Sequence, residues 1–141
     1  MRRLAFVMIC LLSLAIRAQT SAEKQAIIVV KGPTIVAFSP PVTDQQIEKD
    51  PGTNEALSDF QFYASEVREP LRKAGVDFQE LYVNWFKVRI GSKVTIFRPG
   101  KVDVGYYFVA PGKKPRIEYG VMTNLDLFRV AHEYFGIPLI D

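Results

Sequence analysis

The only histidine of the chain, His132, is the first residue to consider for catalysis or metal binding. It stands next to Glu133, so a general base or a metal ligand is chemically conceivable here. A metal site with one histidine usually takes further histidine or cysteine ligands. The chain after its N-terminal segment has no second histidine and no cysteine. We therefore predict a structural or surface role for His132, and no catalytic residue, metal site or cofactor. The alternative is a cysteine-independent enzyme that uses His132 or carboxylates.

Ser39 is the second residue that could do chemistry, because it precedes Pro40 and Pro41 at the end of an apolar run. A hydrolase nucleophile of this kind needs a Gly-x-Ser-x-Gly surrounding, which this serine lacks. Loop geometry is therefore the expected reason for it. The acidic residues that follow, within 43–55, do not have the spacing of a calcium-binding loop. We expect a solvated loop there, with a turn at 50–52.

A basic bias marks the later half of the chain. Residues 81–116 contain eight Lys and Arg residues and one acidic residue. Lys87 and Arg89 alternate with Trp85, a spacing that puts all three on one face of a strand. This basic, partly aromatic face could bind an acidic partner or a glycan. The alternative is that exposed hairpins carry lysine to keep their edges from pairing.

The N-terminal segment is typical of a secretory signal peptide. Two arginines precede an apolar run over residues 4–16, and small residues follow. This run of thirteen residues, apolar except for Ser13, is too short to cross a bilayer, which takes about 20. We expect cleavage after Ala18 or Ala22, so that residues 1–22 are the signal and 23–141 form one domain. An uncleaved anchor is the alternative.

Cleavage changes the charge and the redox chemistry of the chain. Of 18 Lys and Arg and 15 Asp and Glu, three arginines and no acidic residues lie in the signal. The mature chain is therefore formally neutral, which argues against a nucleic-acid binder. The only cysteine, Cys10, is also in the signal, so the mature chain has no thiol. We expect a secreted or periplasmic protein that is not inserted in the membrane after cleavage.

The middle of the chain predicts strands around one long helix. Residues 26–30 and 34–38 are short apolar runs, and the second has the composition of a buried central strand. Residues 54–74 carry apolar side chains at steps of three and four, which predicts a helix. Pro70 should kink this helix and Gly75 should end it.

Three further strands are predicted over residues 78–83, 85–90 and 93–97. The last two are joined by Gly91-Ser92, a pair suited to a two-residue hairpin turn. No linker long enough to separate two domains interrupts this part of the sequence.

The end of the chain predicts a hairpin and a closing helix. Residues 106–109 and 115–121 read as strands on either side of Pro111-Gly112, and the second strand alternates between a covered and a wetter face. Thr123 or Asn124 can cap a helix that follows. Together the elements predict a mixed α/β sheet with helices packed on it.

These segments resemble the thioredoxin-like superfamily. TIVAFSPP, residues 34–41, is similar to its first core strand and active-site loop, and the helix with Glu69-Pro70-Leu71 resembles its first helix. Residues 105–135 are similar to its terminal strand, turn, strand and helix. The resemblance implies a thioredoxin-like mixed sheet with flanking helices, in which an extra hairpin replaces the middle helix.

The departures from the family concern its active site. Redox members carry Cys-x-x-Cys where this chain has Ser39-Pro40-Pro41, and a cis proline where it has Val104-Gly105. Disulfide exchange needs a thiolate, so the resemblance implies a redox-inactive member. Its ligand groove would be formed by Ser39, Pro40 and Pro41 facing Val104 and Gly105. We expect an exported module that binds an extracytoplasmic protein or a small ligand. A structural envelope-assembly partner is the third hypothesis.

Overall fold

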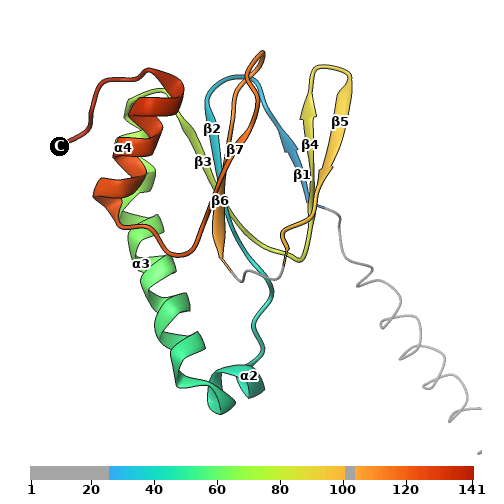
Figure 1. The fold of residues 1–141 in the computed structure, drawn as a ribbon, viewed down its shortest axis with the longest axis vertical. Coiled ribbons are helices and arrows are strands. Elements are labelled where there is room, and N and C mark those ends of the chain that lie inside the picture. The colour runs from blue at the N-terminus through green and yellow to red at the C-terminus, as the bar shows by residue number, and fades with distance from the viewer. Residues whose placement is uncertain (1–25, 101–103) are drawn as a thin grey trace, which may run out of the picture.

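The computed structural model describes residues 26–100 and 104–141, which form a mixed α/β fold with two sheets and three helices (Figure 1). The predicted signal peptide lies outside the described residues. The elements are, in order, β1 (Ile27–Val29), β2 (Thr34–Ser39), α2 (Asp44–Lys49), α3 (Pro51–Lys73), β3 (Asp77–Tyr82), β4 (Phe86–Ile90), β5 (Lys93–Phe97), β6 (Gly105–Val109), β7 (Arg116–Tyr119) and α4 (Asn124–Phe135).

A four-stranded sheet with the order β3-β2-β6-β7 is built around β2. β2 pairs in parallel with β3 and antiparallel with β6, and β7 pairs antiparallel with β6. All six residues of β2 are buried, because the strand has neighbours on both edges and layers on both faces. The prediction of a buried central strand is confirmed.

A second sheet, with the order β1-β4-β5, covers one face of the first. β4 and β5 form the predicted hairpin around Gly91-Ser92, and β1 adds to β4 in parallel. We expected one mixed sheet, and that part of the prediction was wrong. The physical reason is that Val36, Phe38 and Tyr107 project from the first sheet on this side and need an apolar cover. Phe86 and Val88 of β4 supply that cover.

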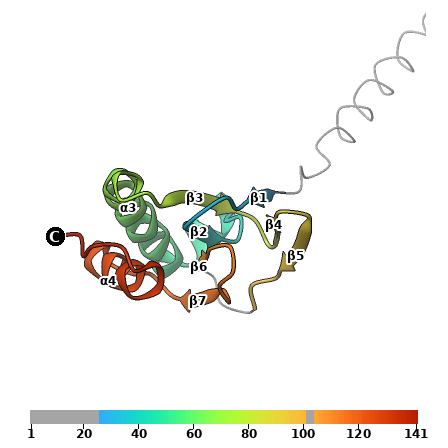
Figure 2. The same cartoon turned by 90° about the horizontal axis from the view of Figure 1, so that it is seen from above.

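Two apolar clusters fill the spaces on either side of the four-stranded sheet. One lies between this sheet and the helices α3 and α4, and the other lies between the two sheets (Figure 2). The buried residues of α3 are Phe60, Ala64, Val67 and Leu71, as the helical spacing predicted. In the parts of the chain that the structure describes, no helix is both long and apolar enough to cross a membrane.

The segment that we expected to be a solvated loop forms α2 and the start of α3. Thr43 and Gln46 cap α2 reciprocally, and the Thr43 hydroxyl oxygen accepts the backbone N–H of Gln46 at 3.3 Å. Asp50 caps α3, and Pro51 takes the first helical position, where proline costs no hydrogen bond. The predicted turn at 50–52 is therefore a helix start.

The predicted faces of β7 are also reversed. Ile117 and Tyr119 are 37% and 48% exposed, although their apolar character predicted the covered face. Arg116 and Glu118 are half-buried instead, because they project toward α4, where Arg116 also pairs with Glu133 at 3.1 Å. β7 is an edge strand of the four-stranded sheet and lies at the margin of the three-stranded sheet that covers it. Its apolar side chains therefore remain partly exposed.

Candidate functional site

A pocket of about 510 Å³ opens at the carboxyl ends of the parallel strands β2 and β3. Ligands commonly bind outside the carboxyl ends of parallel strands, because the chain departs there to opposite sides and leaves a crevice. The residues that line this pocket are Pro40, Pro41, Val42, Gln46, Lys49, Asp50, Thr53 and Asn84. We call it the β2–α2 pocket.

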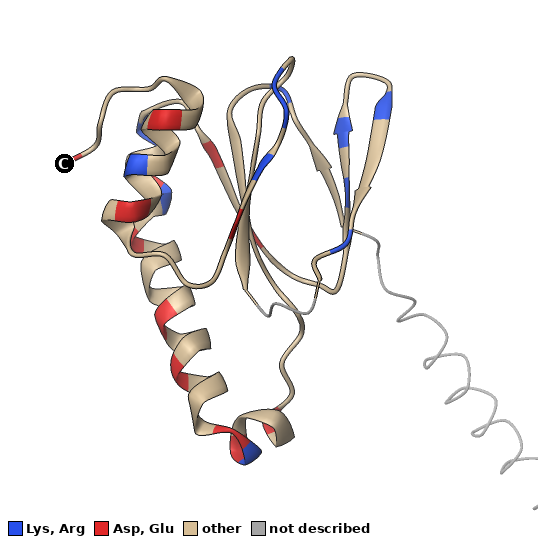
Figure 3. Ribbon diagram, in the orientation of Figure 1, with Lys and Arg blue, Asp and Glu red and all other residues tan. Residues whose placement is uncertain are grey.

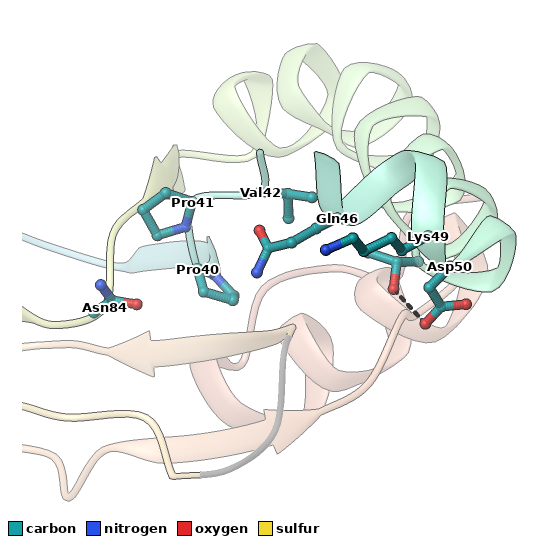
Figure 4. A pocket seen from close by; sticks show the side chains of 8 residues that line it. Pro40, Pro41, Val42, Gln46, Lys49, Asp50 and Asn84 are labelled. Atoms are coloured by element: carbon teal, nitrogen blue, oxygen red, sulfur yellow. Dashed lines mark hydrogen bonds between the residues drawn. The ribbon is translucent and has the colours of Figure 1, made fainter. Parts of the chain in front are cut away.

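The polar wall of the β2–α2 pocket comes from α2 and the start of α3. Gln46 and Lys49 point from α2 toward Pro40, with Asn84 on the far side (Figure 4). The Gln46 side-chain oxygen accepts the backbone N–H of Thr43 at 2.9 Å. Since the carbonyl end of this amide is engaged in the cap, its NH₂ end is left to donate to a ligand.

Asp50 contributes a carboxylate that already has partners. It accepts the Thr53 hydroxyl at 2.8 Å and the Gly52 backbone N–H at 3.0 Å. The hydrogen bond from the Thr53 side chain is the main reason that the pKa of Asp50 is lowered below its usual value. A carboxylate that is held ionised in this way is a poor proton acceptor.

The chemistry that this arrangement offers is binding. Lys49, Gln46 and Asn84 provide hydrogen-bond donors, and the two prolines with Val42 form an apolar wall. Among the described residues, no serine, cysteine or histidine lines the pocket to act as a nucleophile or as a general base. A small polar ligand that carries carbonyl or carboxylate acceptors fits this set of groups.

Two of the five residues predicted for a ligand groove line this pocket. Pro40 and Pro41 do so, whereas Ser39 is buried, and its hydroxyl donates to the Pro40 carbonyl at 3.0 Å. Val104 and Gly105 lie beside the end of β2, since Gly105 pairs with Phe38. They are buried in the sheet and do not reach the pocket.

The polar side of the pocket was missed by the sequence reasoning. Gln46, Lys49, Asp50 and Thr53 all fall in the segment expected to be a solvated loop. Two signals could have located them. The pattern Thr43-x-x-Gln46 is a capping box, and an aspartate before a proline is typical of a helix start.

Trp85, Lys87 and Arg89 belong to the three-stranded sheet and its approach and do not line the pocket, although Trp85 directly follows the lining residue Asn84. Lys87 and Arg89 are alternate residues of β4, and Trp85 directly precedes this strand. The Arg98 guanidinium lies 5.2 Å from the centre of the Trp85 ring, a cation–π distance. Lys87 and Arg89 therefore lie on one face of the sheet, and Arg98 adds a further cation beside Trp85; the binding role of this face stays a prediction.

His132 lies on the exposed side of α4, one turn before the end of the helix. Its Nδ1 is 2.6 Å from the carbonyl oxygen of Ile137, a local contact with the chain that follows the helix. The adjacent carboxylate, Glu133, is engaged by Arg116 and Arg129. Among residues 26–100 and 104–141, no group of three or more His, Cys, Asp or Glu could hold a metal ion. This setting does not favour an enzyme that uses His132.

Comparison with known proteins leaves the family open. No family model matches the sequence, and neither a curated protein nor a solved structure matches the chain.

Proposed function

We propose that this protein is an exported thioredoxin-like module without redox chemistry, which binds a small polar ligand in the β2–α2 pocket. The fold proposal is supported by three features. The strand of residues 34–39 is central, α3 connects it to its parallel neighbour β3, and α4 packs back on the same sheet. The sheet order, with antiparallel β6 and β7 on the other side, agrees with the terminal hairpin of the resemblance.

The observation that carries the function is the place of the pocket. It lies where the first core strand leads into its helix, which is the position of the active site in the family that the chain resembles. Prolines stand there instead of cysteines, and the only cysteine of the sequence is Cys10. Without a thiolate the site cannot exchange disulfides, so contact with a ligand is the use that its donors support.

A titration with N-acetylated amino acids tests the pocket. In a ¹H–¹⁵N spectrum we expect saturable shifts of the side-chain amides of Gln46 and Asn84. Lys49→Met should weaken the binding of the free acids by about tenfold and leave their methyl esters little affected. Lys114→Met is the matched control, since this exposed lysine lies on the turn before β7. Shifts that do not saturate, or an equal effect of both variants, would rule out the proposed pocket.

Export is tested independently by the mass of the mature protein from its native host. Removal of residues 1–18 or 1–22 and recovery outside the cytoplasm are the expected results. A full-length chain in the cytoplasm would contradict this part of the proposal.

One observation favours protein binding as a second function: cations of the three-stranded sheet have no acidic partner within the described residues. They are considered next.

A further inference from the structure

The outer face of the three-stranded sheet combines cations with apolar side chains in a regular pattern. Residues opposite one another in register project from the same face of a sheet. Two register rows cross this face, each with a cation between two apolar residues: Ile27, Lys87 and Ile96, then Val29, Arg89 and Val94. Arg98, stacked on Trp85, extends the pattern beyond the first row. We call these residues the basic sheet face.

The charges of the basic sheet face do not lie on the edge strands, where they would keep the sheet from pairing with other strands. Natural sheets place lysine and other charges on their edge strands to prevent pairing. On this face Lys87 and Arg89 lie on β4, the central strand, while the edge strands carry apolar residues. Lys93 of β5 pairs with Ile90 and lies on the other face. Ile27, Val94 and Ile96 are 52%, 52% and 49% exposed. Edge protection therefore does not account for the two cations.

The cations of the basic sheet face have no acidic partner within the described residues. The ion pairs of residues 26–100 and 104–141 join α3, β3, β7 and α4, and none includes Lys87, Arg89 or Arg98. Residues 84–100 contain no Asp or Glu. In Figure 3 the ribbon is blue at several positions of this sheet, and most of the red positions lie on the helices. The local field attracts an acidic molecule.

The backbone of β5 is open toward solvent on the side away from β4. The Lys87 N–H donates to the carbonyl oxygen of Ala26 at 3.0 Å, and the Arg89 carbonyl oxygen accepts the N–H of Val30 at 2.9 Å. These groups of Lys87 and Arg89 therefore point toward the β1 segment. The two residues therefore form the non-hydrogen-bonded pairs with β5. It follows that the N–H and C=O groups of Val94 and Ile96 point outward, where no described strand pairs with them.

We propose that this edge binds an extended acidic segment of a partner protein, which adds to β5 as a fourth strand. Its backbone pairs with the outward groups of Val94 and Ile96, as in other cases of strand addition. Neighbouring strands lie about 4.8 Å apart, so carboxylates on alternate residues reach Lys87 and Arg89 across the short side chains of β5. The proposal is independent of the β2–α2 pocket, which lies on another part of the molecule.

Labelled hexapeptides with alternating glutamate and valine test this proposal by fluorescence anisotropy with the full chain. We expect them to bind at least about tenfold more tightly than peptides with lysine in place of glutamate. The double variant Lys87→Glu, Arg89→Glu should lose at least about tenfold in affinity for the acidic peptide. The matched double variant Lys73→Glu, Lys114→Glu, at two exposed lysines outside this sheet, should stay within about twofold. Equal losses in the two variants would overturn the proposal.

N-methylation of the peptide separates strand addition from simple charge attraction, and it needs no change in the protein. An added strand turns the amides of alternate residues toward β5. Methylation of one alternate set should abolish binding, and methylation of the other set should leave it within about twofold. If both methylated peptides bind equally well, no strand is added. A concentration-dependent dimer in sedimentation, blocked by Lys87→Glu, would identify a second copy as the occupant and overturn the proposal as well.

Discussion

At the scale of single residues, Gly105 shows the tightest constraint on side-chain size. A Cβ at this position would lie 2.5 Å from the Phe38 ring and 2.8 Å from the carbonyl oxygen of Glu118. One of these atoms is backbone and cannot move without disturbing the β6–β7 ladder. The glycine therefore allows the Phe38 ring to pack between the sheets.

We expect Gly105→Ala to lower the free energy of unfolding by about 3 kcal/mol, as overpacking of a dense core does. Gly32→Ala is the control, because no atom lies within 4 Å of a Cβ built there. That variant should stay within about 0.5 kcal/mol of the parent. Urea denaturation measures both values, and similar values for the two variants would contradict the packing argument.

Tyr106 gives the protein a predictable response to alkali. Its ring is fully buried and its hydroxyl accepts the Met122 N–H at 3.3 Å. Burial raises the pKa of Tyr106 to about 12. In the unfolded chain a tyrosine ionises near pH 10, so between about pH 10 and 12 only the unfolded state releases this proton.

Stability is therefore complete below about pH 10 and falls by about 1.4 kcal/mol per pH unit above it. Urea midpoints between pH 8 and 11.5 measure this slope. Tyr106→Phe should flatten it, although a weaker slope remains because burial also raises the pKa of Tyr82, Tyr107 and Tyr134. An unchanged slope in the variant would show that another group is responsible.

At the scale of secondary-structure elements, the start of α4 depends on one hydroxyl. The Thr123 oxygen accepts the Asp126 backbone N–H at 3.3 Å and donates to the Asp126 carboxylate at 2.9 Å. This donation is the main reason that the pKa of Asp126 is lowered. A carboxyl whose pKa is lowered by folding adds stability that is lost as the pH falls through the lowered pKa. The cap therefore also makes the protein more sensitive to acid.

Thr123→Ala should lower the free energy of unfolding by about 1 kcal/mol at neutral pH, the usual cost of a lost N-cap. It should also move the pKa of Asp126 up toward the ordinary carboxyl value. NMR titration of the Asp126 carboxyl carbon measures the second effect. Thr123→Ser keeps the hydroxyl and should change neither quantity appreciably. If Thr123→Ser lost as much stability as Thr123→Ala, the effect would come from the methyl group of Thr123 and not from its hydroxyl.

At the scale of the whole molecule, an aromatic cluster joins the two sheets. Phe86 is fully buried, and its ring centre lies 6.1, 5.1 and 5.7 Å from those of Phe38, Phe97 and Tyr107. The three-stranded sheet shares no strand pairing with the first sheet, so its attachment depends on apolar packing between the two sheets, in which these rings take a large part.

Phe86→Ala should therefore lower the free energy of unfolding by about 3–5 kcal/mol, the cost of a large aromatic cavity. Phe62→Ala removes the same ring from an exposed site on α3, where the side chain is 56% exposed. It should cost less than about 1 kcal/mol. We expect the denaturation curves of the two variants to have a common slope, and the midpoint of Phe86→Ala to lie below that of Phe62→Ala.

Much of the fold follows from local signals in the sequence. The central strand could be predicted from its apolar run, the β4–β5 hairpin from Gly91-Ser92, and α4 from Thr123 at its start and Gly136 at its end. Gly136 has φ 72°, the left-handed conformation that glycine takes at helix ends. Of the candidate site, only Pro40 and Pro41 were predicted, although the capping signals at Thr43 and Asp50 mark the helix starts that carry its polar half.

The sequence by itself determined the order of the strands and helices apart from α2, the burial of β2 and the absence of cysteine beyond Cys10. These depend on composition and on the spacing of neighbouring residues. The tertiary structure decided which sheet the hairpin joins, which face of β7 is open, and that α2 closes a pocket against Pro40. The physical reason is that pairing and burial link residues far apart in the chain, and local periodicity carries no information about which distant apolar face a strand will cover.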